Sequence, residues 1–169
     1  MKVQGIVTTI GDDIDTDIIF PARYLAILDP KEQAKYLFEP LGADFRDKVC
    51  AGGVLAAGWN FGCGSSREHA VTSLIGAGVK LVVAKSFSRI FFRNSINTGL
   101  PVIVSSELAE AVADGVSVEV DLEAGSAQVG GRSIAFDPLS PELLTILTAG
   151  GLWAAHAQKT GGNHAAHAG

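Results

Sequence analysis

The chain carries the stretch Asn60-Phe-Gly-Cys-Gly-Ser-Ser-Arg-Glu-His-Ala70 between two segments of different character. The apolar residues 53–59 before it predict a strand, and residues 67–76 predict a helix. Gly62 and Gly64 form a Gly-x-Gly turn between them. The stretch therefore predicts a strand, a tight turn and a helix start, which together place backbone N–H groups and polar side chains at one point.

Ser65, Ser66 and Arg67 follow that turn. A helix N-terminus carries unpaired N–H donors and positive dipole charge, so the point suits an anion. The stretch lacks the lysine of a phosphate loop, and its glycines do not match the dinucleotide fingerprint. The sequence therefore predicts an anion pocket with candidate catalytic hydroxyls.

Each of these side chains also has a simpler interpretation. Serine is a favoured N-cap, so one serine can cap the helix while the other faces a ligand. The Arg67 guanidinium can stabilise a serine alkoxide or clamp a carboxylate. The alternative, a surface ion pair with Glu68, is disfavoured because adjacent helix residues point apart.

Composition sets the broad class of the protein. We expect one domain over residues 1–160 and a mobile, low-complexity tail over residues 161–169. A hydrophobic content of 47% with 20 glycines is typical of a compact α/β protein. A net charge of −5 argues against a nucleic-acid surface. No apolar run reaches the roughly 20 residues that span a bilayer, and no signal peptide precedes the first strand, so we expect no membrane association and a cytoplasmic location.

Two cysteines, Cys50 and Cys63, are too few and too far apart for a zinc site. A disulfide between them is disfavoured in a reducing compartment. We expect no metal site in this chain, and any iron–sulfur chemistry would need thiolates from another chain.

Apolar runs and helical segments alternate along the rest of the chain. Strands are predicted at residues 2–10, 53–58, 80–85 and 100–104, and helices at 31–38, 67–76, 86–97, 106–114 and 141–149. Short antiparallel strands are predicted at 116–122, 126–129 and 133–136, adding a second β layer, and residues 152–158 are expected to extend the last helix. The pattern favours an α/β fold with a largely parallel sheet covered by helices.

Other polar residues have ordinary interpretations beside functional ones. Asp12, Asp13, Asp15 and Asp17 lack the Gly and Glu of a calcium loop. Asp15 and Asp17 are the better candidates for orienting a site, whereas Asp12 and Asp13 are expected to be solvated. His69 is interpreted as structural.

Two further features stay open. Cys63 lies next to the serines without an assigned role. Arg89 and Arg93, at i and i+4, either lie over neighbouring aromatic rings or contact a partner.

Three segments together resemble one family. Gly11-Asp-Asp-Ile-Asp-Thr-Asp-Ile-Ile, the stretch at 60–70 and Lys85-Ser-Phe-Ser-Arg-Ile-Phe-Phe-Arg-Asn resemble the 3-isopropylmalate dehydratase small subunits and the swivel domains of aconitase and homoaconitase. The resemblance runs from about residue 2 to residue 155 in the same order. It implies a swivelling β/β/α domain, as in the aconitase C-terminal domain.

The resemblance also implies an activity. A separate large subunit would carry a [4Fe–4S] cluster, whose open iron polarises a departing hydroxyl group, and this chain would carry no cofactor. The substrate would be a small hydroxy-dicarboxylate, dehydrated and rehydrated at the neighbouring carbon. Ser65 matches the serine that removes the substrate α-proton, Ser66 and Arg67 match its carboxylate-binding neighbours, and Asp17 matches an active-site aspartate.

The loop Arg23-Tyr24-Leu25-Ala26-Ile27 corresponds to the family's specificity loop. Homoaconitase-like members resemble Tyr-Leu-Arg-Thr there, whereas Ala26 and Ile27 suit an apolar isopropyl group. Arg23 is a further candidate carboxylate contact. The resemblance therefore favours isopropylmalate, with a related alkylmalate or homoaconitate as alternatives. A non-catalytic anion-binding module on the same scaffold is the alternative from another class.

Overall fold

The computed structural model describes residues 1–161. The strands span Lys2–Thr9 (β1), Gly53–Ala57 (β2), Leu81–Ala84 (β3), Val102–Val104 (β4), Ser117–Asp121 (β5), Ser126–Val129 (β6) and Arg132–Ala135 (β7). The α-helices span Thr16–Ile19 (α1), Pro30–Gln33 (α2), Ala43–Gly52 (α3), His69–Gly76 (α4), Arg89–Thr98 (α5), Ser106–Ala111 (α6), Pro141–Ala149 (α7) and Leu152–Gly161 (α8). Three 3₁₀ turns span Ala22–Tyr24 (η1), Ala34–Tyr36 (η2) and Glu39–Leu41 (η3).

The strands form one sheet in the order β4-β3-β2-β1-β5-β6-β7. Strands β1 to β4 run parallel, with Val54 opposite Leu81 and Val82 opposite Val102. Both faces of the central strands β2 and β3 are buried, which explains why these two strands read as continuous apolar runs rather than as alternating ones. The predicted parallel sheet is confirmed.

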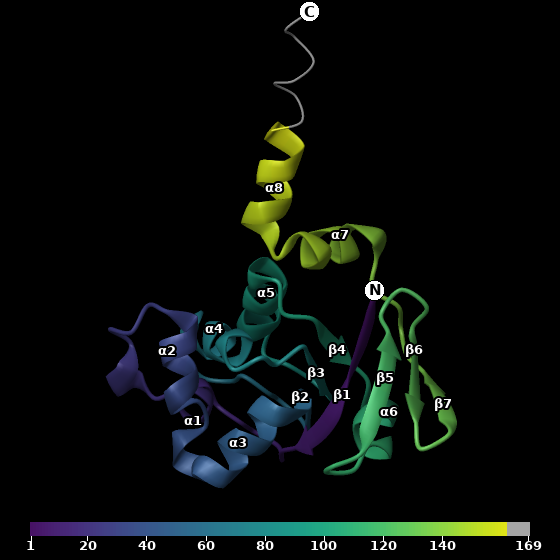
Figure 1. Ribbon diagram of the computed structural model, residues 1–169, viewed down its shortest axis with the longest axis horizontal. Helices are drawn as coiled ribbons and strands as arrows, with labels where there is room; N and C mark the ends of the chain where they lie inside the picture. Colours follow the sequence, from purple (N-terminus) through teal and green to yellow (C-terminus); the bar gives the residue numbers. More distant parts are fainter. Residues whose placement is uncertain (162–169) are drawn as a thin grey trace, which may run out of the picture.

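The predicted second β layer is not a separate sheet. Strand β1 pairs antiparallel with β5, so the hairpins β5 to β7 continue the sheet at its other edge. Val120 of β5 and Ala127 of β6 share a core with Val54 of β2 and Val83 of β3. The sheet therefore curls over its own parallel half, with β5–β7 on one side and helices α1–α4 on the other (Figure 1). This is the swivelling β/β/α fold.

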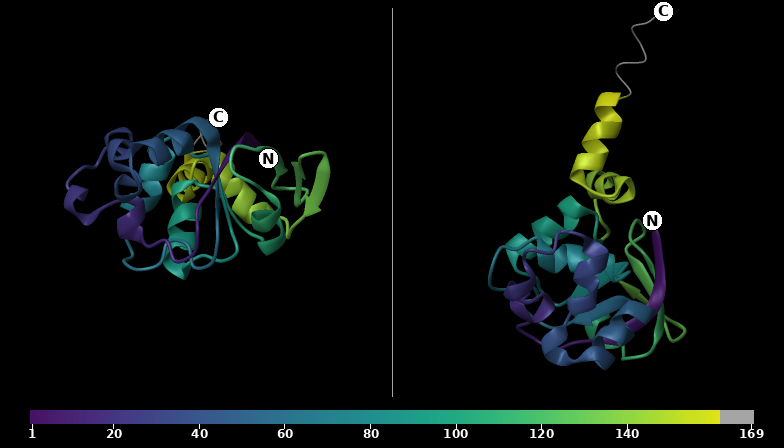
Figure 2. Two further views of the ribbon diagram at one scale, coloured as in Figure 1. Left: turned by 90° about the horizontal axis from the view of Figure 1, so that it is seen from below. Right: turned by 60° about the vertical axis from the view of Figure 1, so that its left-hand side comes forward.

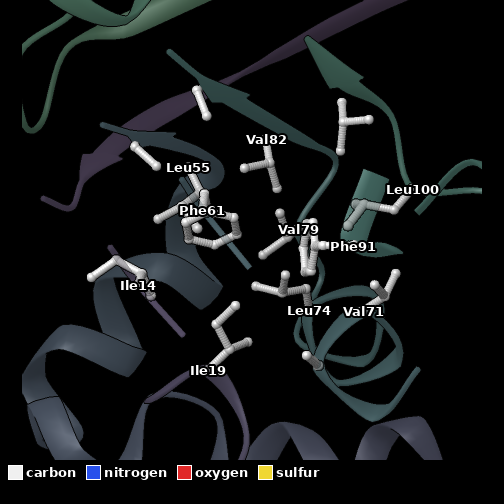
Figure 3. Packing of buried hydrophobic residues seen from close by; sticks show 14 of the residues in the cluster. Ile14, Ile19, Leu55, Phe61, Val71, Leu74, Val79, Val82, Phe91 and Leu100 are labelled. Carbon is white, nitrogen blue, oxygen red and sulfur yellow. The ribbon is translucent and has the colours of Figure 1, made fainter. Parts of the chain in front are cut away.

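A second core fills the space between the parallel strands and the helices (Figure 3). Leu55 and Val82 point from the sheet toward Leu74 of α4 and Phe91 of α5. Phe61, completely buried, packs edge-to-face on Phe91 with ring centroids 5.1 Å apart. This core fixes α4 and α5 under the loops that follow β2 and β3.

Several helices begin or end elsewhere than predicted. Helix α5 begins at Arg89 because Ser88, not Ser86, caps it, while the Ser86 carbonyl accepts the Phe61 N–H at 3.0 Å. Helix α6 is likewise capped by Ser105. The short α1 and the helix α3, which no clear apolar period announces, are absent from the prediction.

Residues 152–161 do not extend α7 but form a second helix. Gly150 and Gly151 both adopt positive φ angles, 87° and 120°, which end α7 and turn the chain. A Cβ at Gly151 would lie 2.5 Å from the Asn97 carbonyl oxygen, so the turn packs against the end of α5. Helix α8 consequently stands away from the body of the molecule (Figure 2).

None of the helices within residues 1–161 combines the length and hydropathy needed to cross a bilayer. The tail predicted for residues 161–169 lies, apart from Gly161, outside the described residues. The boundary of a single domain at residue 160 stays a prediction.

Candidate functional site

Three loops meet beyond the carboxyl ends of β1, β2 and β3. The Gly62 N–H donates to the Ile14 carbonyl at 2.8 Å, and the Thr16 N–H donates to the Cys63 carbonyl at 2.9 Å. The Ser88 hydroxyl donates to the Gly62 carbonyl at 2.6 Å. These bonds join the acidic turn, the glycine loop and the start of α5 into one rigid edge of the sheet, where ligands of open α/β sheets bind.

Gly62 is required at the centre of this junction. Its φ angle is 75°, and an added Cβ would lie 2.2 Å from the ring of Phe91. A side chain at residue 62 would therefore strain the backbone and displace a core phenylalanine. The glycine turn read from the sequence thus serves the close approach of the loop to α5.

The acidic turn and the glycine loop bring Asp17 and Arg67 into contact. The Arg67 Nη1 donates to the Asp17 Oδ1 at 2.5 Å, and Nη2 lies 3.5 Å from Oδ2. The Arg67 side chain is 22% exposed and the Asp17 side chain 55% exposed. The guanidinium is therefore held at the surface of the edge by a partner 50 residues away in sequence.

Asp15 positions Asp17, the acidic member of this pair. Its carboxylate caps α1 by accepting the N–H groups of Asp17 at 2.8 Å and Ile18 at 2.9 Å. Asp17 in turn accepts the Ala22 N–H at 3.1 Å. The hydrogen bond from Arg67 lowers the pKa of Asp17 below its usual value, with partial desolvation opposing and the Arg67 charge and the Ala22 N–H assisting. Asp17 is thus an anion that orients Arg67.

Neither serine caps α4. The helix begins at His69 after Glu68, with no side-chain cap, so it starts two residues later than predicted. Ser65 and Ser66 are exposed, and neither hydroxyl bonds to another side chain or backbone group of residues 1–161. The Asn94 side-chain amide of α5 donates to the Ser66 carbonyl at 3.4 Å and so attaches the loop to α5. Both hydroxyls are therefore available to a ligand beside the Asp17–Arg67 pair.

The loop at residues 23–27, which the resemblance predicts to set substrate choice and which is called the specificity loop on that basis, is attached to the same edge. Phe20, which lies between Asp17 and the loop, stacks on His69 of α4 at 6.0 Å between ring centroids and lies 6.2 Å from the Tyr24 ring. The Tyr24 hydroxyl donates to Glu39 at 2.8 Å, and the Arg23 guanidinium pairs with the same carboxylate. The stacking agrees with the structural interpretation of His69.

Within the loop, the side chains differ in what holds them. Arg23 is engaged by Glu39, so a substrate carboxylate would have to compete for it. Tyr24 stacks on Tyr36 at 3.9 Å. Leu25 and Ile27 are partly buried, whereas Ala26 is exposed and makes no polar contact. Ala26 is therefore the loop position at which a larger side chain disturbs the fewest contacts within the fold.

Two residues of the site were not among the predicted ones. Glu39 holds the loop at residues 23–27 and lies outside the three quoted segments, whereas Asn94, which holds the serine loop, ends the third segment but had no role assigned. Asp12 and Asp13, expected to be solvated, are exposed but bind the glycine loop at the Trp59 N–H and the Asn60 side-chain amide. These contacts depend on segments that meet only in the fold.

The cysteines do not fit an iron–sulfur cluster on this chain. Cys50 lies in α3 before β2 and Cys63 lies in the loop after it, so the two thiols occupy opposite ends of the strand. Burial raises the pKa of both thiols, for Cys63 with help from Asp15 and Asp13. Within residues 1–161 no group of three His, Cys, Asp or Glu side chains could hold a metal ion.

The Asp17–Arg67 pair makes stability depend on pH. The folded-state pKa of Asp17 lies below the ordinary 3.8, so its stabilising contribution is complete above pH 3.8 and is lost as the pH falls through the lowered value. We expect Asp17→Asn to be less stable than the parent at about pH 7 and the difference to shrink by about pH 3. Urea unfolding of both proteins at each pH measures it. A difference independent of pH would mean that the pair does not stabilise the fold through its charge.

The comparisons with known proteins agree with this geometry. The family model described as the aconitase C-terminal domain matches residues 12–107. The 3-isopropylmalate dehydratase small subunit of Pyrobaculum aerophilum is 49% identical, over 90% of this chain and 95% of the relative. The 2,3-dimethylmalate dehydratase small subunit of Eubacterium barkeri is 45% identical, over 90% of this chain and 94% of the relative.

A solved structure extends the likeness to three dimensions. The crystal structure of 3-isopropylmalate dehydratase (LeuD) from Methanocaldococcus jannaschii matches with a TM-score of 0.87 and 40% identity, over 95% of this chain and 96% of that one. The sequence likeness thus covers nearly the whole chain, including all three loops of the site. The chain belongs to the family of the aconitase C-terminal domain and the 3-isopropylmalate dehydratase small subunits.

Proposed function

We propose that this chain is the small subunit of a 3-isopropylmalate dehydratase, which interconverts 2-isopropylmalate and 3-isopropylmalate in leucine biosynthesis. The observation that carries the proposal is the Arg67 guanidinium, fixed by Asp17 beside two unengaged serine hydroxyls. The relatives named as small subunits support a heteromeric enzyme, and we place the [4Fe–4S] cluster on its large subunit.

The first role of the site is to bind a carboxylate of the substrate. A guanidinium donates two parallel hydrogen bonds to a carboxylate, and a neighbouring hydroxyl adds a third donor. Asp17 takes one N–H of Nη1 and one of Nη2, so Arg67 offers the substrate its remaining N–H donors, and Ser66 supplies the hydroxyl. Because Asp17 keeps the guanidinium in place, little side-chain entropy is lost when the substrate binds.

The second role is to move a proton. Ser65, as an alkoxide, takes the proton from the carbon next to a carboxylate, and the C–H electron pair forms the double bond as hydroxide leaves the neighbouring carbon. The cluster of the large subunit would supply the Lewis acid that takes up this hydroxide. Rehydration reverses these events with the hydroxyl placed on the other carbon. A serine is a weak base, so the positive charge of Arg67 and the loop N–H groups must stabilise the alkoxide.

The third role is substrate choice. Ala26 and Ile27 offer an apolar surface to an alkyl substituent and leave a third carboxylate without a partner. The similarity to a 2,3-dimethylmalate dehydratase subunit makes that alkylmalate the second candidate substrate.

Turnover by the reconstituted complex tests the function. The chain is combined with a large subunit of the same enzyme family, after reconstitution of the cluster, and is assayed on isopropylmalate, 2,3-dimethylmalate and homoaconitate. We expect the highest kcat/KM on isopropylmalate, and no activity or visible absorbance from the isolated chain. Preference for dimethylmalate would select the second candidate. Binding of dicarboxylates without turnover of any would instead indicate the anion-binding module.

A further inference from the structure

Exposed apolar side chains gather at the edge of the sheet that carries the site. Trp59 follows β2 and is 50% exposed, and Val104 ends β4 and is 51% exposed. Ile90, in the first turn of α5, is 46% exposed. The carboxyl ends of parallel strands lie at one edge, so these residues and the serine loop share a side of the molecule. Apolar groups exposed together at a functional edge are typical of an interaction surface.

Two arginines lie on the same face of α5. Arg89 and Arg93 are exposed, and their i, i+4 spacing brings them together. Neither forms an ion pair with a carboxylate of residues 1–161, unlike Arg23, Arg46 and Arg67. Arg89 is moreover the first residue of the helix, where the dipole disfavours a cation. Helix stability therefore does not explain these positions.

The arginines border a cleft of about 430 Å³ with an aromatic lining. Phe87, Phe92 and Val104 line it together with the two arginines and Ser86. Aromatic residues and arginine are enriched in protein–protein interfaces, where an apolar centre is surrounded by charged groups. The cleft thus suits a protein segment better than a small anion.

Helix α5 and its N-cap connect the cleft to the site. Asn94, which donates to the Ser66 carbonyl, follows Arg93 directly on α5. Ser88, which donates to the Gly62 carbonyl, precedes Arg89. A molecule that binds the outer face of α5 therefore contacts the helix that supports the serine loop.

We propose that Trp59, Arg89, Ile90, Arg93 and Val104 form a docking surface for the large subunit and that it receives an acidic, partly apolar segment of that subunit. This inference rests on the proposed function, because the partner is the chain that would complete the site. In a chain of net charge −5, two guanidinium groups without an ion-pair partner among residues 1–161 select carboxylates. The apolar residues supply the apolar surface that is buried from water when the partner binds.

Charge reversal of the arginines tests the surface. Arg89→Glu combined with Arg93→Glu is titrated against a fixed amount of large subunit, and the apparent Kd is measured by calorimetry and from turnover. We expect the Kd to rise about 10-fold to 100-fold, with kcat at saturating small subunit unchanged. The neutral pair Arg89→Gln and Arg93→Gln should give a smaller rise, and it also serves if the charge-reversed protein fails to fold.

Arg132→Glu is the matched control. Arg132 begins β7, is exposed and forms no ion pair within residues 1–161, so it reverses one charge, half the change of the double variant, away from α5. A Kd equal to that of the parent in the double variant would overturn the inference, as would equal losses in the control. A fall in kcat at saturation with an unchanged Kd would also overturn it and assign the arginines to catalysis.

The two proposals fail in different ways. A parent complex that forms but does not turn over isopropylmalate would contradict the proposed function, while the calorimetric Kd would still decide the surface. Failure of the parent chain to bind the large subunit at all would overturn both.

Discussion

Replacing Ser65 with alanine is expected to lower kcat of the reconstituted complex by about 10²-fold to 10⁴-fold, the contribution of a positioned base. The hydroxyl makes no hydrogen bond within the described chain and is exposed, so its loss leaves the fold intact. Because proton removal occurs only in the transition state, KM should change little. Steady-state kinetics of both proteins and their melting temperatures measure the effect.

Two further serine variants serve as comparisons for the Ser65→Ala result. Ser133→Ala removes an exposed serine from β7, away from the site, and should leave kcat unchanged. Ser66→Ala should raise KM through weaker carboxylate binding. If Ser65→Ala kept the parent kcat while Ser66→Ala lost it, the base would be Ser66, and the assignment of the two hydroxyls would be wrong.

Replacing Ala26 with arginine is expected to change substrate preference by about 10-fold to 1000-fold in relative kcat/KM, away from isopropylmalate and toward homoaconitate. An arginine facing an isopropyl group stays desolvated and unpaired, whereas one facing a carboxylate forms a charge-assisted pair. The existing Arg23 does not supply that cation freely because Glu39 holds it. Paired kinetics on the two substrates with the reconstituted complex measure the ratio.

The control for this change is Ala113→Arg, at an exposed alanine between α6 and β5. It adds the same charge outside the specificity loop and should leave the ratio as it is. A ratio unaffected by Ala26→Arg would show that residues 23–27 do not line the substrate pocket, and the preference for isopropylmalate would lose its main support.

Local sequence pattern predicted most elements because their causes are local. The run at 80–85 is apolar on both faces, so it predicts a buried strand, and β3 confirms it. The helix predicted at 31–38 begins as α2 at Pro30, and the Asp29 carboxylate caps it by accepting the Lys31 N–H at 2.9 Å. Where local signals are weak, as in α3, whose apolar residues show no clear period, the prediction failed because packing against β1 and β2 stabilises the helix.

For the site too, some features were predicted from the sequence and others depended on the fold. The residue types and order of its three segments were sufficient for the resemblance, and the resemblance led to the prediction that Asp17, Ser65, Ser66 and Arg67 belong to the site. The capping role of the serines could not be settled from sequence, because serine before a helix suits either role and the register of the first turn depends on the surrounding loops. The structure starts α4 at His69 and leaves both hydroxyls unengaged.

The sequence by itself determined the strand–helix alternation, the glycine turn and the family, since these depend on neighbouring residues and on motif order. Only the tertiary structure decided that the hairpins continue one curled sheet, that Arg67 binds Asp17 and that Glu39 engages Arg23. Each of these contacts joins segments that are distant along the chain. Their formation depends on how the sheet curls and how the loops close, which no local pattern encodes.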